Sequence, residues 1–466
     1  MGSEMCIRDS AKHRSLQVIA DPLYWRQSAV QPSIAGIMQP ADFDITAYTA
    51  LDDTAAYEKA GITTEQWNAK QAAAWYADGG DSETPSAYAW QGNNCWTLDA
   101  LTAAREQGYD TVIADASFDA DQTEAVHTGT YVVHTPAGDV TVLKEQSTLG
   151  TLAKGQATST DAQAESSDAG RLARLIAQSA FYQMEQPYAE RNLLVCLNED
   201  SDPSVVDALM SDIEQSPWLN LTDLATLKDA DISEDAASMS TDLPQTDGLT
   251  DGMRSDVQQT LSALANSSSN IKRFNTSILV KPNGKDESDV NTWSRQLTNA
   301  HTIMALHALG GESPSRSTMA EGANQLAALL INGVAITPTE SVNVVSETAK
   351  MPVTISNSHP YPVKVKVSSL TDSMQIVTSR FDTVQVPPHG EAQVAFTIRV
   401  STSGTANATI SLFDRNGAAF GATQVTHITS ALQISDKSGF VIIGFAVLLG
   451  AVGLWRQFNR KKDPDE

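Results

Sequence analysis

The sequence predicts a multidomain protein with an α/β domain, a helical segment, an all-β domain and a single transmembrane helix. Residues 11–228 alternate strand-like apolar runs with amphipathic stretches of helical period, which favours parallel strands in a barrel-like or doubly wound sheet. Residues 336–434 contain short runs of period-two alternation separated by turn residues, a pattern typical of an immunoglobulin-like β-sandwich. Residues 439–455 are uncharged and almost wholly apolar, which predicts a helix that crosses a membrane.

The α/β domain divides into recognisable elements. Its predicted strands are residues 15–22, stopped by Asp-Pro, residues 111–116, and the buried run 191–198. Its predicted helices include residues 97–110, which close at Gly108, and residues 202–213. Residues 128–144 read as a hairpin across the turn residues 136–139.

Two segments connect this domain to the sandwich. Residues 229–252 are acidic and rich in Ser and Thr, which predicts a linker or long loop, and residues 253–335 have helical patterning and should pack on the α/β domain. In the sandwich, alternation should place two rows of side chains inside, namely Val363, Val365 and Val367, and Val394, Phe396, Ile398 and Val400.

The apolar run predicts both location and orientation. Phe440 and Trp455 would flank the membrane interfaces, and a basic cluster follows at Arg456, Arg460, Lys461 and Lys462. Positive charge marks the cytoplasmic side, so residues 456–466 would form a cytoplasmic tail of a single-pass cell-membrane protein whose large N-terminal part is extracellular. Residues 1–30 contain no signal peptide, and residues 1–10 resemble a sequencing-adaptor artefact, so we expect an N-terminally truncated copy.

The net charge restricts the partners. The chain has 31 Lys and Arg against 56 Asp and Glu, a formal charge of −25, which argues against nucleic-acid binding because such a surface repels phosphate. The membrane bilayer is the partner that the sequence itself predicts. Cys95 and Cys196 either form a disulfide or remain two unpaired thiols, the second buried as a small apolar side chain.

Aspartates at strand ends are the candidates for catalysis. Asp21, Asp78 and Asp115, together with Asp81 and Asp200, lie in turns, and Asp21, Asp115 and Asp200 follow predicted strands. Ligands collect at the carboxyl ends of parallel strands, so such carboxylates could hydrolyse a glycoside or hold a metal for deacetylation. Helix caps and turns explain the same residues more simply. The sequence predicts no cofactor and no metal site.

Five tryptophans gather early in the chain, and two roles are open to them. Exposed rings could stack on sugars, whereas buried rings would fill the core. The tryptophans are Trp25, Trp67, Trp75, Trp90 and Trp96.

Four segments carry a resemblance to a known family. They read IADPLYW (19–25), PWLNLTDLATL (217–227), MPVTISNSHPYPVKVKVSSL (351–370) and VPPHGEAQVAFTIRV (386–400). Together they resemble the DUF6049 family of actinobacterial membrane-anchored envelope proteins of unknown function. The resemblance implies partners among envelope proteins or the peptidoglycan-synthesis machinery, because genes of this family commonly lie beside that of the lipid II flippase. It implies no catalytic residues.

These observations lead to two hypotheses of function. The first is a non-catalytic structural or interaction protein of the cell envelope, linked to the export of peptidoglycan precursors. The alternative is an extracellular glycan-active hydrolase or deacetylase that uses the strand-end carboxylates of the α/β domain.

Overall fold

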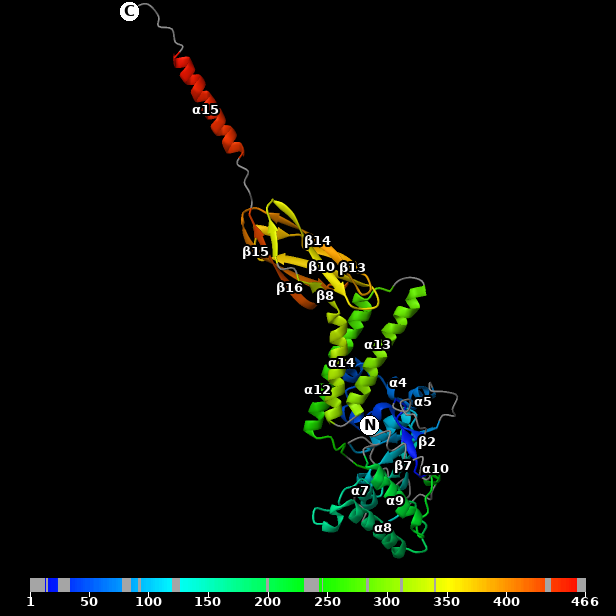
Figure 1. Cartoon of the computed structure of the whole chain (residues 1–466). Coiled ribbons are helices and arrows are strands. Elements are labelled where there is room, and N and C mark those ends of the chain that lie inside the picture. The colour runs from blue at the N-terminus through cyan, green and yellow to red at the C-terminus, as the bar shows by residue number, and fades with distance from the viewer. Residues whose placement is uncertain are drawn as a thin grey trace, which may run out of the picture. The chain divides into compact units, whose positions relative to one another are not determined.

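The chain divides into two compact units, which we describe separately (Figure 1). Unit 1 comprises residues 1–272 and 292–328, and unit 2 comprises residues 273–291 and 329–466. The computed structural model describes residues 13, 16–23, 34–77, 85–90, 94–119, 126–197, 201–229, 243–244, 246–281, 285–310, 313–338, 341–431 and 437–458.

The strands of unit 1 form two sheets. One sheet has the order β1-β2-β3 and is parallel, and a second has the order β4-β5-β7-β6, in which only β6 is antiparallel. A single residue, Tyr88, separates β3 from β4, so one extended segment pairs with β2 on one side and with β5 on the other. The strands are β1 (Val18–Ala20), β2 (Ile34–Ile37), β3 (Ser86–Ala87), β4 (Ala89–Trp90), β5 (Thr111–Ala114), β6 (Thr130–Thr135) and β7 (Gly138–Lys144).

The helices of unit 1 begin where the sequence provides caps. The side chains of Asp44, Asp53, Thr97, Asp202 and Asp223 each accept a hydrogen bond from a backbone N–H of the first helical turn, as helix N-caps do. The α-helices described between residues 45 and 228 are α2 (Ile45–Leu51), α3 (Thr54–Lys59), α4 (Thr64–Trp67), α5 (Ala69–Ala77), α6 (Leu98–Glu106), α7 (Ser147–Ala153), α8 (Asp168–Glu185), α9 (Pro203–Gln215) and α10 (Leu224–Lys228).

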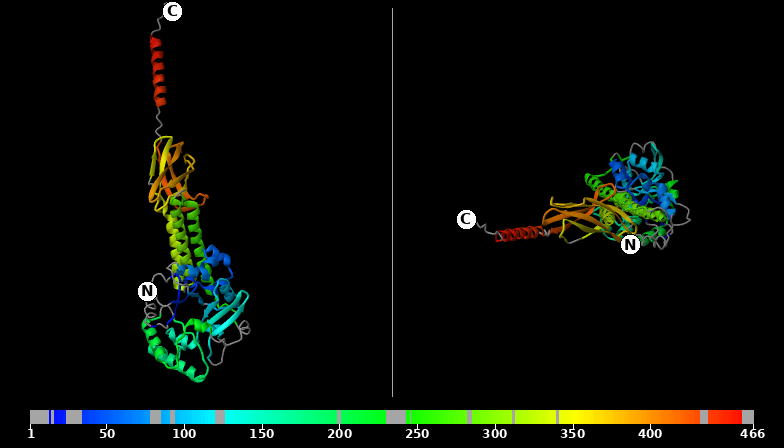
Figure 2. Two further views of the ribbon diagram at one scale, coloured as in Figure 1. Left: turned by 90° about the vertical axis from the view of Figure 1, so that its right-hand side faces the viewer. Right: turned by 90° about the horizontal axis from the view of Figure 1, so that it is seen from above.

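Aromatic side chains fill the main core of unit 1. Trp67 is fully buried, with its ring stacked on that of Phe43 at 5.3 Å and tilted against that of Tyr48 at 5.4 Å. Three long helices run side by side in Figure 1 and in the left view of Figure 2: α12 (Asp251–Arg273), α13 (Lys285–Gly310) and α14 (Ser313–Asn332). Their apolar side chains in unit 1 join the same core, including Leu261, Leu264, Leu306 and Ala323.

One predicted strand of unit 1 is wrong. Of the predicted strand 191–198, the structure describes residues 191–197, and these form only an isolated parallel bridge between Leu194 and Glu145. Residues 191–195 are only half-buried, and the Arg191 guanidinium donates to the backbone carbonyls of Val126 and Tyr182. A charged group held locally in this way keeps the start of the run at the margin of the core.

Unit 2 contains two sheets that face each other (Figure 1). The first has the order β12-β14-β10-β8 and the second has the order β13-β11-β15-β16-β9. Both rows of side chains expected inside lie there, since Val363, Val365, Val367, Phe396 and Ile398 are all fully buried. The strands are β8 (Val334–Thr337), β9 (Ser341–Val344), β10 (Thr348–Asn357), β11 (Val363–Thr371), β12 (Ile376–Thr378), β13 (Phe381–Val386), β14 (Gly390–Val400), β15 (Gly404–Phe413) and β16 (Ala419–Ser430).

A π-helix, η5 (Phe274–Ile278), packs on the turn between β15 and β16 within unit 2. Arg273 donates from Nε to the buried carboxylate of Asp414 at 2.6 Å, and Arg415 donates to the carbonyl of Thr276 at 2.6 Å. Charge-assisted hydrogen bonds of this kind fix the turn more firmly than neutral ones.

The predicted transmembrane helix is not found in the structure. Helix α15 (Lys437–Phe458) contains the apolar run, but no helix among the residues that the structure describes is long and apolar enough to span a bilayer. The prediction of a single-pass cell-membrane protein with an extracellular and a cytoplasmic part is therefore corrected.

The residues assigned to that anchor have the following places. Trp455 and Arg456 lie in the last turns of α15 with exposed side chains. Phe440 lies in its first turn. Arg460, Lys461 and Lys462 lie outside the described residues.

Candidate functional site

The carboxyl edge of the parallel strands in unit 1 gathers the polar side chains that could do chemistry. Asp21 follows β1, Gln39 follows β2, Asp115 follows β5, and Lys144 and Glu145 end and follow β7. In parallel α/β structures this edge is where ligands usually bind. We therefore take these five residues as the candidate site and call it the strand-edge site.

The carboxylate of Asp21 is hydrogen-bonded to the turn that follows β2. Its Oδ1 accepts the backbone N–H of Leu23 at 2.9 Å and that of Ala41 at 3.1 Å. Ala41 and Asp42 both have left-handed backbone angles, with φ of 58° and 51°, which residues other than glycine rarely adopt. The carboxylate thus helps to hold a strained turn in place.

Gln39 joins two strands by its amide. The side chain is fully buried, its Nε2 donates to the carbonyl of Trp90 at 2.9 Å, and its Oε1 accepts the N–H of Trp90 at 2.8 Å. These two hydrogen bonds join the chain after β2 to β4 in the way that paired backbone groups join neighbouring strands. Both ends of the amide are therefore engaged in structure.

Asp115 and Lys144 are the neighbouring opposite charges of the strand-edge site. Asp115 is exposed, and its Oδ1 accepts the N–H of Ser117 at 2.8 Å and its hydroxyl at 2.5 Å. Burial lowers the pKa of the Lys144 ammonium, and the charge of Asp115 opposes that shift. Burial raises the pKa of the nearby Cys95 thiol, and Asp115 raises it further, so the thiol stays protonated and is a poor nucleophile at neutral pH.

Glu145 forms a buried ion pair. The residue is 4% exposed. Its carboxylate accepts a hydrogen bond from Nζ of Lys154 at 2.5 Å and another from the backbone N–H of Cys196 at 3.1 Å. Loss of one partner of a buried pair typically costs about 3–5 kcal/mol. Glu145 thus fixes β7 to the segment that contains Cys196.

The structure does not bring the predicted catalytic aspartates together. Asp21 and Asp115 follow β1 and β5, which are three strand positions apart, or about 14 Å along the sheet at about 4.8 Å per strand. Glycosidase carboxylates stand about 5–9.5 Å apart. Asp78, Asp81 and Asp200 lie outside the described residues.

Sequence reasoning missed three members of the strand-edge site, namely Gln39, Lys144 and Glu145. Each is a polar residue directly at or after the end of an apolar run, which is the same signal that singled out Asp21 and Asp115. A search limited to aspartates in turns could not find an amide, a lysine or a glutamate.

The metal and cysteine questions have plain answers for the described residues. Over that part of the chain, no three His, Cys, Asp or Glu side chains are grouped so as to hold a metal ion. Cys95 and Cys196 are both free thiols, so the disulfide alternative is not realised.

The tryptophans expected either on sugars or in the core divide by position. Trp67 and Trp96 are buried, and the indole N–H of Trp96 donates to the carbonyl of Ile113 at 3.1 Å. Trp75 is half-buried beside the main core, Trp90 is half-buried beside a second cluster that includes Ile113 and Leu143, and Trp25 lies outside the described residues.

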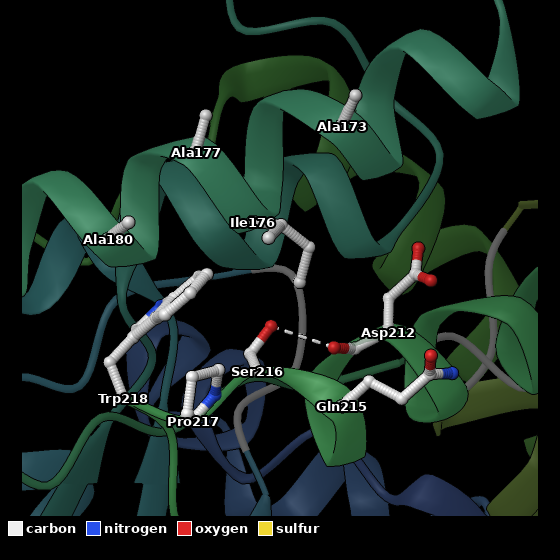
Figure 3. A pocket seen from close by; sticks show the side chains of 9 residues that line it. All are labelled: Ala173, Ile176, Ala177, Ala180, Asp212, Gln215, Ser216, Pro217 and Trp218. Atoms are coloured by element: carbon white, nitrogen blue, oxygen red, sulfur yellow. Dashed lines mark hydrogen bonds between the residues drawn. The ribbon is translucent and has the colours of Figure 1, made fainter.

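A separate groove lies between α8 and the residues after α9 (Figure 3). Its volume is about 510 Å³, and its lining is mostly apolar. It is lined by Ala173, Ile176, Ala177, Ala180, Asp212, Gln215, Ser216, Pro217 and Trp218. The hydroxyl of Ser216 donates to the carbonyl of Asp212 at 2.8 Å, which closes the end of α9.

Comparisons with known proteins place the chain in a family. The model of a family of unknown function, DUF6049, matches residues 8–466. No curated protein matches the chain.

Solved structures give weak likenesses. WR4, a C. elegans member of the MSP family, is 8% identical over 22% of this chain and 99% of its own, with a TM-score of 0.17. A FixG-related protein from Vibrio parahaemolyticus is 10% identical over 22% of this chain and 100% of its own, with a TM-score of 0.18. The CARDB domain of PF1109 from Pyrococcus furiosus is 17% identical over 22% and 94%, with a TM-score of 0.17. Scores this low support no inference about this chain.

Proposed function

The chain belongs to the DUF6049 family, and we propose that it is a non-catalytic structural or interaction protein of the cell envelope. The observation that carries this proposal is the use of the strand-edge site by the fold itself. The carboxylate of Asp21 binds two backbone N–H groups, that of Asp115 binds Ser117, and that of Glu145 binds Lys154 and Cys196. An acid–base enzyme needs carboxylates free to approach one reacting bond.

The proposed partners are envelope proteins, including the machinery that makes or exports peptidoglycan precursors. This part of the proposal comes from the family resemblance. The acidic surface supports protein partners rather than nucleic acid, because its net charge of −25 repels a phosphate backbone.

A glycan-active hydrolase is the second candidate, and one observation favours it. Asp115 and Lys144 lie beside each other at the carboxyl edge, and burial lowers the pKa of the lysine. A carboxylate beside a partly desolvated amine is a recognised arrangement for proton transfer.

Substitutions at this pair separate the two candidates. We expect Asp115→Asn and Lys144→Gln, each made in the complete protein, to restore the wild-type phenotype when they replace the gene in its own organism. Asn keeps an acceptor oxygen for Ser117, so the stability cost should stay below about 1 kcal/mol. The measurement is growth and cell morphology of the complemented deletion strain.

Asp21→Asn and Glu145→Gln serve as matched controls. Asp21→Asn should complement, whereas Glu145→Gln should lower the melting temperature because it leaves Lys154 without its charged partner. If Asp115→Asn or Lys144→Gln abolishes complementation while melting and protein level stay at wild-type values, the hydrolase becomes the better explanation.

A further inference from the structure

Helix α8 has two apolar faces, and only one of them is covered. On the inner face Leu175, Ser179 and Tyr182 are buried against a small core that includes Leu149, Leu152 and Leu209. On the outer face Ala173 and Ala177 are exposed, and beyond them Phe181 is 57% and Met184 is 71% exposed. Large apolar side chains exposed together on one face mark an interaction surface more often than an ordinary surface.

The outer face has the spacing of a helix-packing seam. Ala173, Ala177, Ala180 and Met184 are separated by four, three and four residues, which is the alternation of core positions in a coiled coil. Phe181 lies beside the seam, one turn from Ala177. We call the four residues Ala173, Ala177, Ala180 and Met184 the α8 seam.

A fixed wall borders the α8 seam. In Figure 3 the ring of Trp218 lies below α8, on the side to which Ile176 points and near Ala180, whereas the side chains of Ala173 and Ala177 point away from it. The indole N–H of Trp218 donates to the hydroxyl of Ser179 at 3.0 Å, so the ring orientation is set before any partner arrives. A preformed groove loses little side-chain entropy when it is filled.

We propose that the α8 seam pairs with the same seam of a second copy of this chain, the two α8 helices running antiparallel about a two-fold axis. The seam is symmetric about the midpoint between residues 178 and 179. An antiparallel pair therefore places Ala173 of one copy opposite Met184 of the other, and Ala177 opposite Ala180. Small side chains meet a large one at each end of the contact, which is the self-complementarity that a two-fold interface requires.

Charge supports the antiparallel arrangement. Arg174 flanks the N-terminal half of the seam and Glu185 flanks its C-terminal half, so antiparallel pairing brings Arg174 of one copy toward the end that carries Glu185 in the other. The net charge of each copy opposes association, but exposed charges beyond about 8 Å are screened at physiological ionic strength.

The contact area predicts a weak dimer. Helix α8 has 18 residues and is about 27 Å long, so a strip about 10 Å wide covers roughly 300 Å² of each copy. Stable interfaces bury about 800 Å² per partner. Tyr188 and Trp218 enlarge the strip, yet we expect dissociation constants in the micromolar range or above.

Position-specific disulfides test the register. In full-length protein with Cys6→Ser, Cys95→Ser and Cys196→Ala, we introduce Ala173→Cys in one sample and Met184→Cys in another. Neither alone should form a disulfide-linked dimer, because each residue lies about 16 Å along the axis from its own symmetry mate. An equimolar mixture should form the linked dimer. Because α15 exposes a row of apolar side chains that can also drive association, the cross-link is a sharper readout than mass alone.

A second variant tests the energetics. Ala177→Arg places a bulky charge in the middle of the seam and should weaken dimerisation, followed by analytical ultracentrifugation, by about tenfold or more. The matched control is Ala74→Arg, at an exposed alanine of α5, which should leave the dimer unchanged. Both variants should melt at the wild-type temperature.

Three outcomes would overturn the proposal. One is a monomer at every concentration with no cross-link in the mixture, which would leave the seam to a different partner protein. Another is a disulfide-linked dimer from Ala173→Cys alone, which would indicate parallel helices. The third is a dimer that Ala177→Arg does not weaken.

Discussion

The two units differ in charge and in how their strands are stabilised. Unit 1 has 17 Lys and Arg against 43 Asp and Glu, a net charge of −26, whereas unit 2 has 14 against 13, a net charge of +1. The acidity of the chain is therefore a property of unit 1 alone. Any partner chosen by charge should be chosen by unit 1, because unit 2 offers no net field to steer it.

The strands show the same division. Those of unit 1 have two to seven residues and depend on an aromatic core, while β10, β11, β14, β15 and β16 of unit 2 have nine to twelve and form long ladders. A short strand contributes few ladder bonds, so its position is set by what packs on it. A long one fixes its own register by alternation.

Removal of the central indole of unit 1 should have the largest effect. Trp67→Ala leaves a cavity beside Phe43 and Tyr48 and should lower the free energy of unfolding of unit 1 by about 3–5 kcal/mol. Pulse proteolysis in urea, with the fragments mapped by mass spectrometry, reports each unit separately. The strands of unit 2 should keep their wild-type midpoint, and an equal shift of both midpoints would show that the units unfold as one. Trp75→Ala, at a half-buried position, is the milder control.

Within unit 2, the buried carboxylate of Asp414 should be the most sensitive point outside the ladders. Arg273→Met removes its charged donor and leaves the N–H groups of Asn416 and Ala418, which should cost about 2–3 kcal/mol. The same proteolysis assay should show a lower midpoint for unit 2 alone. Arg399→Met, at an exposed position of β14, should leave the midpoint of unit 2 unchanged. An equal fall in the midpoint for both variants would contradict the stabilising role assigned to the contact of Arg273 with Asp414.

The free energy of unfolding of the two units should depend differently on pH because of their histidines. Burial lowers the pKa of His359, which is 6% exposed and lies 2.9 Å from the carbonyl of Leu330 through Nε2. A lowered pKa means that the unfolded chain takes up the proton first, so unit 2 should lose stability as pH falls below about 6.5, by up to about 1.4 kcal/mol between pH 7.5 and 5.5. His359→Gln should flatten this dependence, whereas the exposed His427→Gln should not.

Unit 1 should respond to acid less simply. Burial lowers the pKa of His301 and His307, which repeats the behaviour of His359. The hydrogen bond with Asp207 raises the pKa of His13, and the hydrogen bond with Glu214 raises it further. The contact of His13 with these carboxylates is therefore fully stabilising below about pH 6.5 and weakens as the pH rises through the raised pKa. The contribution of His13 opposes those of His301 and His307, so unit 1 should lose less stability in acid than these two buried histidines alone would cause. A His13→Gln variant with an unchanged acid response would contradict this.

The same contrast explains what the sequence could predict. Alternation alone placed Val363, Val365 and Val367 on the inner face of a sheet, and all three are fully buried. The hairpin of β6 and β7 could also be predicted from the sequence, because Ala137 and Gly138 follow a proline between two apolar runs. Residues 191–198 had the same apolar appearance, but Arg191 donates to the carbonyls of Tyr182 and Val126, 9 and 65 residues away, and no local pattern records these contacts.

The candidate site was predictable in kind but not in detail. Strand ends followed by aspartate indicated the correct edge of the sheet for Asp21 and Asp115. The distance between them depends on how many strands intervene, which no local pattern records. The proximity of Asp115 to Lys144 likewise arises only when β5 and β7 become neighbours although β6 lies between them in sequence. The family resemblance was confirmed, whereas the membrane-spanning helix predicted from the apolar run of α15 was not found among the described residues.

The turn after β2 restricts how the sequence can vary. A Cβ atom at Gly310 would lie 2.3 Å from the carbonyl oxygens of both Ala41 and Asp42, and these are backbone atoms that cannot swing aside. Ala41 and Asp42 in turn tolerate their left-handed angles because the surrounding contacts hold them there. Any homologue that replaces Gly310 should therefore also have rebuilt this turn, so positions 41, 42 and 310 are expected to evolve as a single unit although more than 260 residues separate them in the chain.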